Sequence, residues 1–402
     1  MIKTHLEIDL DQAEKNAKSL KEKYSEYKYL IGVLKSNAYG HGEYIVNAFI
    51  KGGINYIAVS YIEEALKVRK YNKDIPILCL QPIMIDDLKL ANDNNITITI
   101  NSINYLKEVI SNIKNNKLKV HLKLDTGMNR LGFKDKNEVK EAVEMIKSNK
   151  NLELEGIFSH FATVGLFTKN FDNQVEEFKN LTSLIDLKSI PIVHFGSSVI
   201  TISHKKLDFC TGTRVGIALY GYNVSLTESS AGIKNKLRIL RNRYYQKKYN
   251  ISSVLVNQKL DLKPCISMYT RIIEIKDVKK GEYVGYGATY QASEDIKIAI
   301  LPIGYYDGIG SNNNSRYVLI NGKKYYAVGS MAMNMMAIKI DEKVKIDDKV
   351  CILGEGITPR TMALFDNRGV VPMLLELGKT NTHYYLKKGK VVYIEGEENE
   401  NK

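Results

Sequence analysis

The chain has 402 residues, of which 44% are hydrophobic and 26% are charged, and its formal net charge is +13. This length exceeds the roughly 250–300 residues at which a single hydrophobic core usually stops growing, so two domains are expected. The charged start of the chain and the lack of a run of about 18 apolar residues predict no signal peptide and no membrane partner. We therefore expect a cytoplasmic globular protein.

Much of the positive charge is concentrated in one place. Seven lysine and arginine residues, with no acidic residue among them, lie between Lys234 and Lys248. With no recognisable nucleic-acid-binding module, this pattern predicts a local basic segment and no nucleic acid partner. The four cysteines are far apart and form no CxxC pair, so neither a disulfide framework nor a metal site is expected.

The first half of the chain alternates short apolar runs with longer amphipathic segments, after a short first element that carries Leu6, Ile8 and Leu10. The apolar runs predict strands at Tyr29–Leu34, Tyr56–Ser60, Ile75–Leu80, Ile96–Ile100, Lys119–Leu124, Leu152–Phe158, Pro191–Phe195 and Phe209–Arg214. Apolar residues three or four positions apart predict helices between them, most clearly at Ile62–Tyr71, Ile103–Asn115, Glu138–Lys147 and Phe171–Asp186. Eight strands alternating with helices favour a (β/α)8 TIM-like barrel over an open sheet.

The pattern changes from about Thr227. A basic, polar stretch is followed by short alternating runs with glycines between them, which predict a mainly β domain without βαβ units. Strands are expected at Ser267–Ile275, Tyr283–Gly287, Ile296–Pro302, Tyr317–Ile320, Lys324–Gly329, Met335–Ile340, Lys349–Gly354 and Val391–Glu395. The predicted division is a barrel at 1–226, a basic linker or insertion at 227–259 and a mainly β domain at 260–402.

A barrel predicts that functional side chains gather where its strands end. Lys35 follows the first strand, and polar clusters follow the fifth to the eighth at 123–130, 159–161, 194–198 and 212–217. A lysine at the end of an interior strand must lose its proton or meet a partner, which is what a Schiff-base lysine requires. From Lys35 alone, a side chain that merely reaches past the strand end to solvent is the simpler interpretation. Five polar clusters at one rim favour the chemical role.

Three features also suggest a phosphate site at this rim. Gly216 and Ile217 offer backbone N–H groups after the eighth strand, Ser198 offers a hydroxyl after the seventh, and Tyr39 follows the first. Barrels often bind phosphate beside their last two strands. A glycine after a strand is usually just a turn, so the set carries the prediction rather than any single member.

At this point the chain resembles a known family. Residues 33–42, Val-Leu-Lys-Ser-Asn-Ala-Tyr-Gly-His-Gly, are similar to the cofactor-lysine signature of the alanine racemases, pyridoxal 5'-phosphate enzymes built from a barrel and a β domain. Further matches follow in the family's order at 121–132, 160–163, 214–221, 284–290 and 301–308, across both domains. The resemblance implies an isomerase that converts L-alanine to D-alanine for peptidoglycan.

The resemblance implies two bases, one on each face of the substrate. Lys35 would bind the cofactor and act as one base, and Tyr286 of a partner subunit would be the other, so a homodimer with a shared active site is expected. A tyrosine with a pKa of about 10 is a poor base at neutral pH unless neighbouring groups favour its phenolate. Arg130 and His160 match the family residues in that role.

Other matches supply the remaining predicted site residues. Arg214 matches the arginine that faces the pyridine nitrogen, and it would weaken the ring as an electron sink because arginine does not readily give up a proton. Lys123 matches a lysine that the family often carbamylates. Tyr39, Ser198, Gly216 and Ile217 match phosphate contacts; Tyr305, Met333 and Asn334 lie at positions that contact the substrate.

The sequence also departs from the family pattern. Asn334 stands where aspartate is usual, Ser197 where asparagine is usual, Asn129 where glycine is common, and residues 379–383 replace a terminal Arg-Val-Pro-Arg pattern. An amide in place of a carboxylate near the substrate could admit a hydroxyl, so serine or a broader set of amino acids is the alternative substrate class. A non-catalytic pyridoxal-phosphate-binding protein is a further alternative, although such proteins lack the second domain. A decarboxylase of the same architecture is disfavoured because its usual cysteine motifs are missing.

Overall fold

The computed structural model describes residues 4–114, 117–163, 169–222, 260–313 and 315–396, with six isolated positions between 237 and 248. The described chain divides into two compact units that are not continuous in sequence. One unit contains residues 13–35 and 46–263, and the other contains 1–12, 36–45 and 264–402. The predicted segment 227–259 lies almost entirely outside the described residues, and the predicted boundaries at 226 and 260 stay a prediction.

Eight parallel strands in the described residues of the first unit close into a barrel, as the sequence predicted. They are β2 (Tyr29–Val33), β3 (Tyr56–Val59), β4 (Ile77–Cys79), β5 (Ile96–Ile100), β6 (Leu118–Lys123), β7 (Leu152–Phe158), β8 (Ile192–His194) and β9 (Gly212–Val215). Pairing of β9 with β2 closes the ring, with Ile31 opposite Arg214. The strands are buried on both faces, which explains why they are continuous apolar runs in the sequence.

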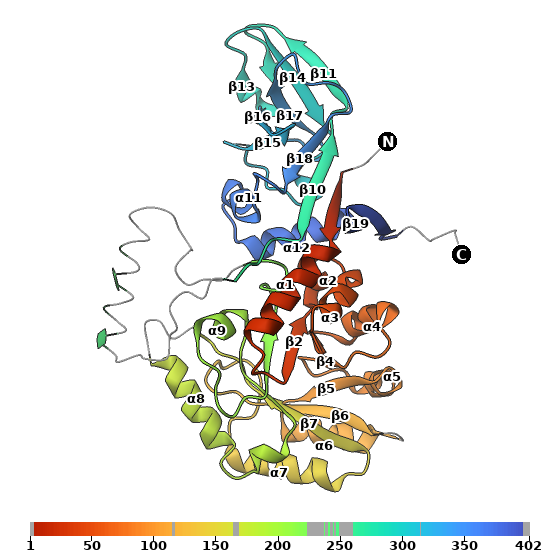
Figure 1. Ribbon diagram of the computed structural model, residues 1–402, viewed down its shortest axis with the longest axis vertical. Coiled ribbons are helices and arrows are strands. Elements are labelled where there is room, and N and C mark those ends of the chain that lie inside the picture. The colour runs from red at the N-terminus through yellow and green to blue at the C-terminus, as the bar shows by residue number, and fades with distance from the viewer. Residues whose placement is uncertain are drawn as a thin grey trace. The chain divides into compact units, whose positions relative to one another are not determined.

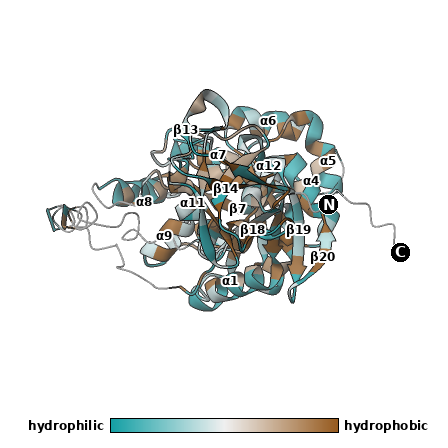
Figure 2. Ribbon diagram, turned by 90° about the horizontal axis from the view of Figure 1, so that it is seen from above, coloured by the Kyte–Doolittle hydropathy of each residue, from teal (hydrophilic) through white to brown (hydrophobic). Residues whose placement is uncertain are grey.

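Helices enclose the barrel strands (Figure 1). They are α1 (Leu10–Lys23), α3 (Val46–Lys51), α4 (Ile62–Tyr71), α5 (Leu88–Asp93), α6 (Ile103–Asn112), α7 (Lys136–Ser148), α8 (Asn170–Leu181) and α9 (Ser198–Ser203). In α7 the buried residues are Val139, Ala142, Val143 and Ile146, the spacing of one helix face. Figure 2 shows the same division between apolar and polar residues along α1 and α6. No helix in the described residues has both the length and the apolar character needed to cross a bilayer.

The second unit is built on a ten-stranded sheet, with the order β11-β14-β17-β16-β15-β18-β10-β1-β19-β20 among the described residues. Its strands are β1 (His5–Asp9), β10 (Ile266–Arg271), β11 (Glu274–Val278), β14 (Ile296–Leu301), β15 (Tyr317–Ile320), β16 (Lys323–Val328), β17 (Met336–Ile340), β18 (Lys349–Leu353), β19 (Thr382–Lys387) and β20 (Lys390–Ile394). A separate hairpin pairs β12 (Tyr283–Val284) with β13 (Tyr290–Gln291). The fold is a TIM-like barrel followed by a mainly β domain, as expected.

Some predicted elements of the second unit were wrong in detail. The run Ser267–Ile275 is two strands, because the chain changes partners at Ile272: β10 pairs with β18 and β11 pairs with β14. Two helices were missed, α11 (Pro359–Phe365) and α12 (Val370–Thr380), and so was strand β19. The first element, β1, belongs to this sheet, where it pairs with β10 and β19.

Candidate active site

The predicted polar residues of the barrel lie at the carboxyl ends of its strands. Lys35 follows β2, Lys123 ends β6, His160 follows β7, Ser198 follows β8 and Arg214 is in β9. The interactions described below connect these residues into one cluster. The structure therefore brings the barrel part of the predicted site together, as parallel strand ends in a closed barrel require.

Lys35 lies in a cationic environment. Its side chain is partly buried, and burial together with the nearby charges of Arg130 and Arg214 lowers its pKa, while the carboxylate of Glu64 acts in the opposite direction. A lowered pKa increases the fraction of neutral amine, which is the form that attacks a carbonyl carbon or removes a proton. The predicted chemical role of Lys35 is therefore physically reasonable at this position.

The four residues after Lys35 form a left-handed turn, which the sequence did not predict. Ser36, Asn37, Ala38 and Tyr39 have φ angles between 48° and 55°. This conformation costs an L-residue about 1–2 kcal/mol. The Asn37 side chain donates to the carbonyl of Gly378 at 3.2 Å, and His383 Nε2 lies 3.0 Å from the carbonyl of Gly40. The α12 and β19 residues of the second unit thus hold the turn, including His383 from the segment that departs from the family pattern.

Arg214 is fully buried at the centre of the barrel end. Its two terminal nitrogens donate to His194 Nδ1 at 2.6 Å, His160 Nδ1 at 3.0 Å and the carbonyl of Ser159 at 2.8 Å, with longer bonds to two further carbonyls. Among the described residues Nε–H makes no hydrogen bond, so it remains as a donor for another group. Burial lowers the pKa of Arg214 to about 10, which keeps it charged at neutral pH.

Lys123 lies beside these cations. Its Nζ is 4.4 Å from the centre of the Phe158 ring, and burial with the charges of Arg214 and Arg130 lowers its pKa to about 7. An amine with this pKa is largely neutral near physiological pH, as reaction with carbon dioxide requires. The residue proposed for carbamylation therefore lies where an added negative charge would be stabilised.

Arg130 lies on a loop that Asp125 organises. The buried Asp125 carboxylate accepts the backbone N–H groups of Gly127, Asn129 and Arg130 at 3.1, 2.9 and 3.0 Å. Asn129, which replaces a common glycine, has a φ of 55°, a conformation that asparagine tolerates better than most residues. The Arg130 side chain is exposed in the single chain.

His160 is neutral in this environment. Burial and the cations Arg214, Lys123, Arg130 and Lys35 lower its pKa to about 3. Because Arg214 donates to Nδ1, the single proton of the neutral ring must be on Nε2. His160 therefore presents a fixed N–H donor rather than a cation.

The predicted phosphate contacts lie after the last two strands. The Ser198 hydroxyl oxygen accepts the N–H of Gly216 at 2.8 Å and that of Ala218 at 3.4 Å. With its oxygen accepting, its own proton is available to an anion. Ile217 lies between these two amides and is partly buried. Tyr39 belongs to the second unit, where burial raises its pKa to about 12.

The remaining predicted residues lie on adjacent loops of the second unit. Tyr286, at the tip of the β12–β13 hairpin, is 74% exposed. Thr289 of the same hairpin bonds Ser330 at 2.8 Å, and the chain continues from Ser330 to Met333 and Asn334, both exposed. The N–H of Tyr306 donates to the carbonyl of Met333 at 2.9 Å.

Tyr305 is 45% exposed on a short 3-10 turn beside this loop. A Cβ at Gly304 would overlap the carbonyl oxygens of Ala332 and Met333, so only glycine permits this approach of the two loops. Buried Asp366 pairs with Arg316 and Arg368, whose guanidiniums donate to the carbonyls of Gly310 and Gly308. Lys379, the other departure weighed above, makes only an exposed pair with Glu376 at 2.9 Å.

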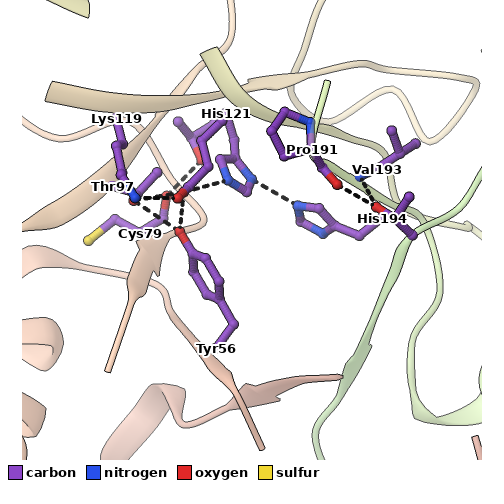
Figure 3. Close-up of polar contacts among 11 residues, drawn as sticks. Tyr56, Cys79, Thr97, Lys119, His121, Pro191, Val193 and His194 are labelled. Carbon is purple, nitrogen blue, oxygen red and sulfur yellow. Dashed lines mark hydrogen bonds and ion pairs between the residues drawn. The ribbon is translucent and has the colours of Figure 1, made fainter. Parts of the chain in front are cut away.

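A buried polar network inside the barrel was not assigned a role from the sequence. It joins Tyr56, Thr97, His121, Glu155 and His194, which come from five strands (Figure 3). Each is a polar residue inside an apolar strand prediction, and that signal could have singled them out. Asp125, which lies in the predicted polar cluster 123–130, was given no role of its own, and Asp366 was missed, because their partners are backbone groups or distant arginines.

The barrel with this rim, followed by a mainly β domain, is the architecture of the two-domain amino-acid racemases. The family models described as "Alanine racemase, N-terminal domain" and "Alanine racemase, C-terminal domain" match residues 8–224 and 265–379. The chain belongs to the alanine racemase family, and it is an amino-acid racemase.

Three relatives illustrate the likeness. The alanine racemase of Borreliella burgdorferi is 35% identical over 389 residues, which cover 94% of this chain and 96% of that protein. The crystal structure of alanine racemase from Bacillus anthracis with bound L-Ala-P has a TM-score of 0.81 and 26% identity, covering 98% of both chains. A histidine racemase from Leuconostoc mesenteroides has a TM-score of 0.80 and 25% identity, covering 96% of this chain and 98% of that one.

Proposed function

We propose that this protein is a pyridoxal 5'-phosphate-dependent alanine racemase. It interconverts L- and D-alanine in the cytoplasm, as a homodimer, and supplies D-alanine for peptidoglycan. The observation that carries the proposal is the environment of Lys35, whose pKa is lowered by burial and by Arg130 and Arg214. The 35% identity to an alanine racemase over 94% of the chain supports alanine as the substrate.

The residues at the barrel rim fit the cofactor by their donor chemistry. The proton of the Ser198 hydroxyl and the backbone N–H of Ile217, next to Gly216, suit a phosphate. The Nε–H of Arg214, which makes no hydrogen bond within the described part of the chain, suits a pyridine nitrogen. Tyr39 and His160 complete the proposed binding set, and the Lys35 amine, whose pKa is lowered by burial and by Arg130 and Arg214, suits an aldehyde. When bound, pyridoxal phosphate supplies the electron sink that stabilises negative charge on the substrate Cα.

Two residues would move the Cα proton, one on each face of the substrate. Lys35 is one base, and Tyr286 of the partner subunit is the other. The role of Tyr286 as the second base depends on His160, whose Nε2–H can donate to a tyrosine oxygen and so favour its phenolate. The exposed position of Tyr286 in the single chain is consistent with a role completed by another subunit.

Arg214 would limit side reactions. It is charged, donates only, and faces imidazole nitrogens and carbonyls, so it cannot readily give a proton to a ring nitrogen. A neutral pyridine is a weaker electron sink than a protonated one, which favours return of the proton to Cα over transamination. Racemisation requires only that short-lived stabilisation.

A second substrate class, which differs from alanine in the size and polarity of its side chain, has specific support. Tyr305, Met333, Asn334 and Arg130 are the proposed substrate contacts, and Asn334 replaces the usual aspartate. A histidine racemase with a TM-score of 0.80 is built on the same fold. Serine or a broader range of amino acids is therefore the second candidate. Racemisation assays with L-alanine, L-serine, L-histidine and larger amino acids distinguish the two.

A Lys35→Ala variant tests the cofactor assignment. The purified wild-type protein is expected to be yellow and to racemise alanine, whereas the variant loses both properties because it lacks the amine that binds the aldehyde. A Lys28→Ala variant, which removes a lysine near the opposite end of the same strand, is the control. Retention of colour and activity by Lys35→Ala would refute the assignment. A yellow wild-type protein that racemises no amino acid would instead support a non-catalytic pyridoxal-phosphate-binding protein.

Mixing two inactive variants tests the shared site. In a homodimer with two-fold symmetry, a hybrid of Lys35→Ala and Tyr286→Ala subunits contains one intact site and one doubly altered site. After random exchange of subunits, about a quarter of wild-type activity should return, since half of the dimers are hybrids with one of two sites intact. No recovery despite demonstrated exchange would place both bases on one subunit.

A further inference from the structure

A line of hydrogen bonds runs through the barrel interior from Arg214 to Glu155, and Figure 3 shows its middle step, between His194 and His121. Arg214 donates to His194 Nδ1 at 2.6 Å, His194 Nε2 lies 3.0 Å from His121 Nδ1, and His121 Nε2 lies 3.2 Å from Glu155 Oε2. Both imidazoles are fully buried. No step of the proposed mechanism requires Glu155, which is separated from Arg214 by two histidines.

The two ends of this line determine where its protons are. Arginine only donates, so His194 must accept at Nδ1. Burial and the charge of Arg214 hold the pKa of His194 well below its ordinary value, so the ring is neutral and its one proton is on Nε2. That proton is donated to His121 Nδ1. Burial also lowers the pKa of His121, and its own proton must then be on Nε2, where it is donated to Glu155.

Glu155 is held as an ionised acceptor. Tyr56 donates to Oε2 at 2.6 Å, Thr97 lies 3.2 Å from the same atom, and Lys119 donates to Oε1 at 2.8 Å. Burial acts to raise its pKa, but the bonds from His121, Lys119 and Tyr56 lower it to about 2. A carboxylate only accepts, so it selects the Nε2–H form of His121.

The backbone is shaped to place this carboxylate. The register between β6 and β7 shifts between Val120 and His121, so that no β6 residue lies opposite Glu155, and this produces a bulge in β7. The next residue is Gly156, where a Cβ would lie only 2.5 Å from the His121 ring. The bulge and the glycine together allow the Glu155 and His121 side chains to meet in the barrel interior.

We propose that Glu155 is a positioning residue for Arg214. Its carboxylate fixes the protonated nitrogens of His121 and His194, so that His194 always offers a bare Nδ1 to the guanidinium. If His121 carried its proton on Nδ1 instead, it would donate to His194 Nε2, and His194 would then carry its own proton on Nδ1. That N–H and the Arg214 guanidinium would be two donors facing each other at 2.6 Å. The guanidinium would then rotate or shift, together with its Nε–H. The inference rests on the proposed function in one respect only, which is that the Arg214 Nε–H faces the pyridine nitrogen of the cofactor.

The proposal is tested by locating the histidine protons in the full-length protein purified with its cofactor. Long-range ¹H–¹⁵N spectra of histidine-labelled protein distinguish Nε2–H from Nδ1–H rings. In the wild-type protein, His121 and His194 should both be Nε2–H. Finding either ring as Nδ1–H overturns the proposal, and this measurement needs no variant.

Substitutions of Glu155 distinguish the effect of its charge and acceptor oxygens from the effect of its packing. Glu155→Met removes the acceptor and should populate the second tautomer and lower kcat by about 10- to 100-fold, with little change in KM, through displacement of Arg214. Glu155→Gln keeps an oxygen that Tyr56 and His121 can share, and should restore the wild-type spectrum and most of kcat. Glu153→Met, on the same strand and outside the network, is the control. A folded Glu155→Met protein with unchanged tautomers and kcat overturns the proposal.

The two proposals can fail separately. If the histidines have the predicted protons but no amino acid is racemised, the proposed function is wrong and the positioning of Arg214 stands. If alanine is racemised but the histidine protons respond to none of these substitutions, only the positioning role of Glu155 is wrong.

Discussion

Substitution of Asp125 by asparagine should weaken the loop that carries Arg130. Oδ1 of Asp125 accepts the N–H groups of Gly127 and Asn129, and Oδ2 accepts that of Arg130. Asparagine has one oxygen, so it can keep the first two bonds but turns an NH2 group toward the Arg130 N–H. One charge-assisted bond is lost and a part-buried donor is left unpaired, which should cost about 2–3 kcal/mol.

Two measurements check this prediction. Urea denaturation should show a free energy of unfolding lower by that amount, and kcat/KM for alanine should fall about 10- to 100-fold because the Arg130 loop is displaced. Asp135→Asn is a matched control, because the exposed Asp135 accepts both of its backbone N–H bonds through a single oxygen. Asparagine can reproduce that arrangement, so activity should not change. Equal stability and activity in the two variants would refute the argument.

Three further predictions concern buried charge and close packing. In bicarbonate-free buffer, the free energy of unfolding of the wild-type protein should rise between about pH 7 and pH 10.5 by up to about 1.4 kcal/mol per pH unit, because the lowered pKa of Lys123 means that the unfolded chain binds more protons across that window. Lys123→Met should abolish this rise. An unchanged pH profile in the variant would contradict the buried, uncharged amine. Gly156→Ala should lower stability by about 1–3 kcal/mol and shift the ¹⁵N resonances of His121, whose ring a Cβ would crowd, and unchanged resonances would argue against this contact. Asp366→Asn should cost about 3–5 kcal/mol by urea denaturation because buried Arg316 loses its counter-charge, whereas Asp295→Asn, in an exposed pair with Lys279, should have little effect.

The barrel was predictable because local pattern and tertiary environment agree there. Its strands are buried on both faces, so each is a continuous apolar run, and α7 repeats its apolar residues at helical spacing. The β domain was predicted less accurately, because the change of partner at Ile272 depends on which strands lie on either side. Helices α11 and α12 were missed in a region expected to be mainly β.

The sequence by itself determined the barrel, the mainly β second domain and the family, and it singled out Lys35 as the candidate cofactor lysine, because motifs and periodicity are local properties of the chain. Tertiary structure alone decided the protonation of the site, since a pKa depends on burial and on charges distant in sequence. The pKa values of Lys35 and Lys123 are lowered by burial and by the charges of Arg130 and Arg214. Tertiary structure also decided the line from Glu155 through His121 and His194 to Arg214, which joins four strands only because the barrel closes and a bulge turns Glu155 inward.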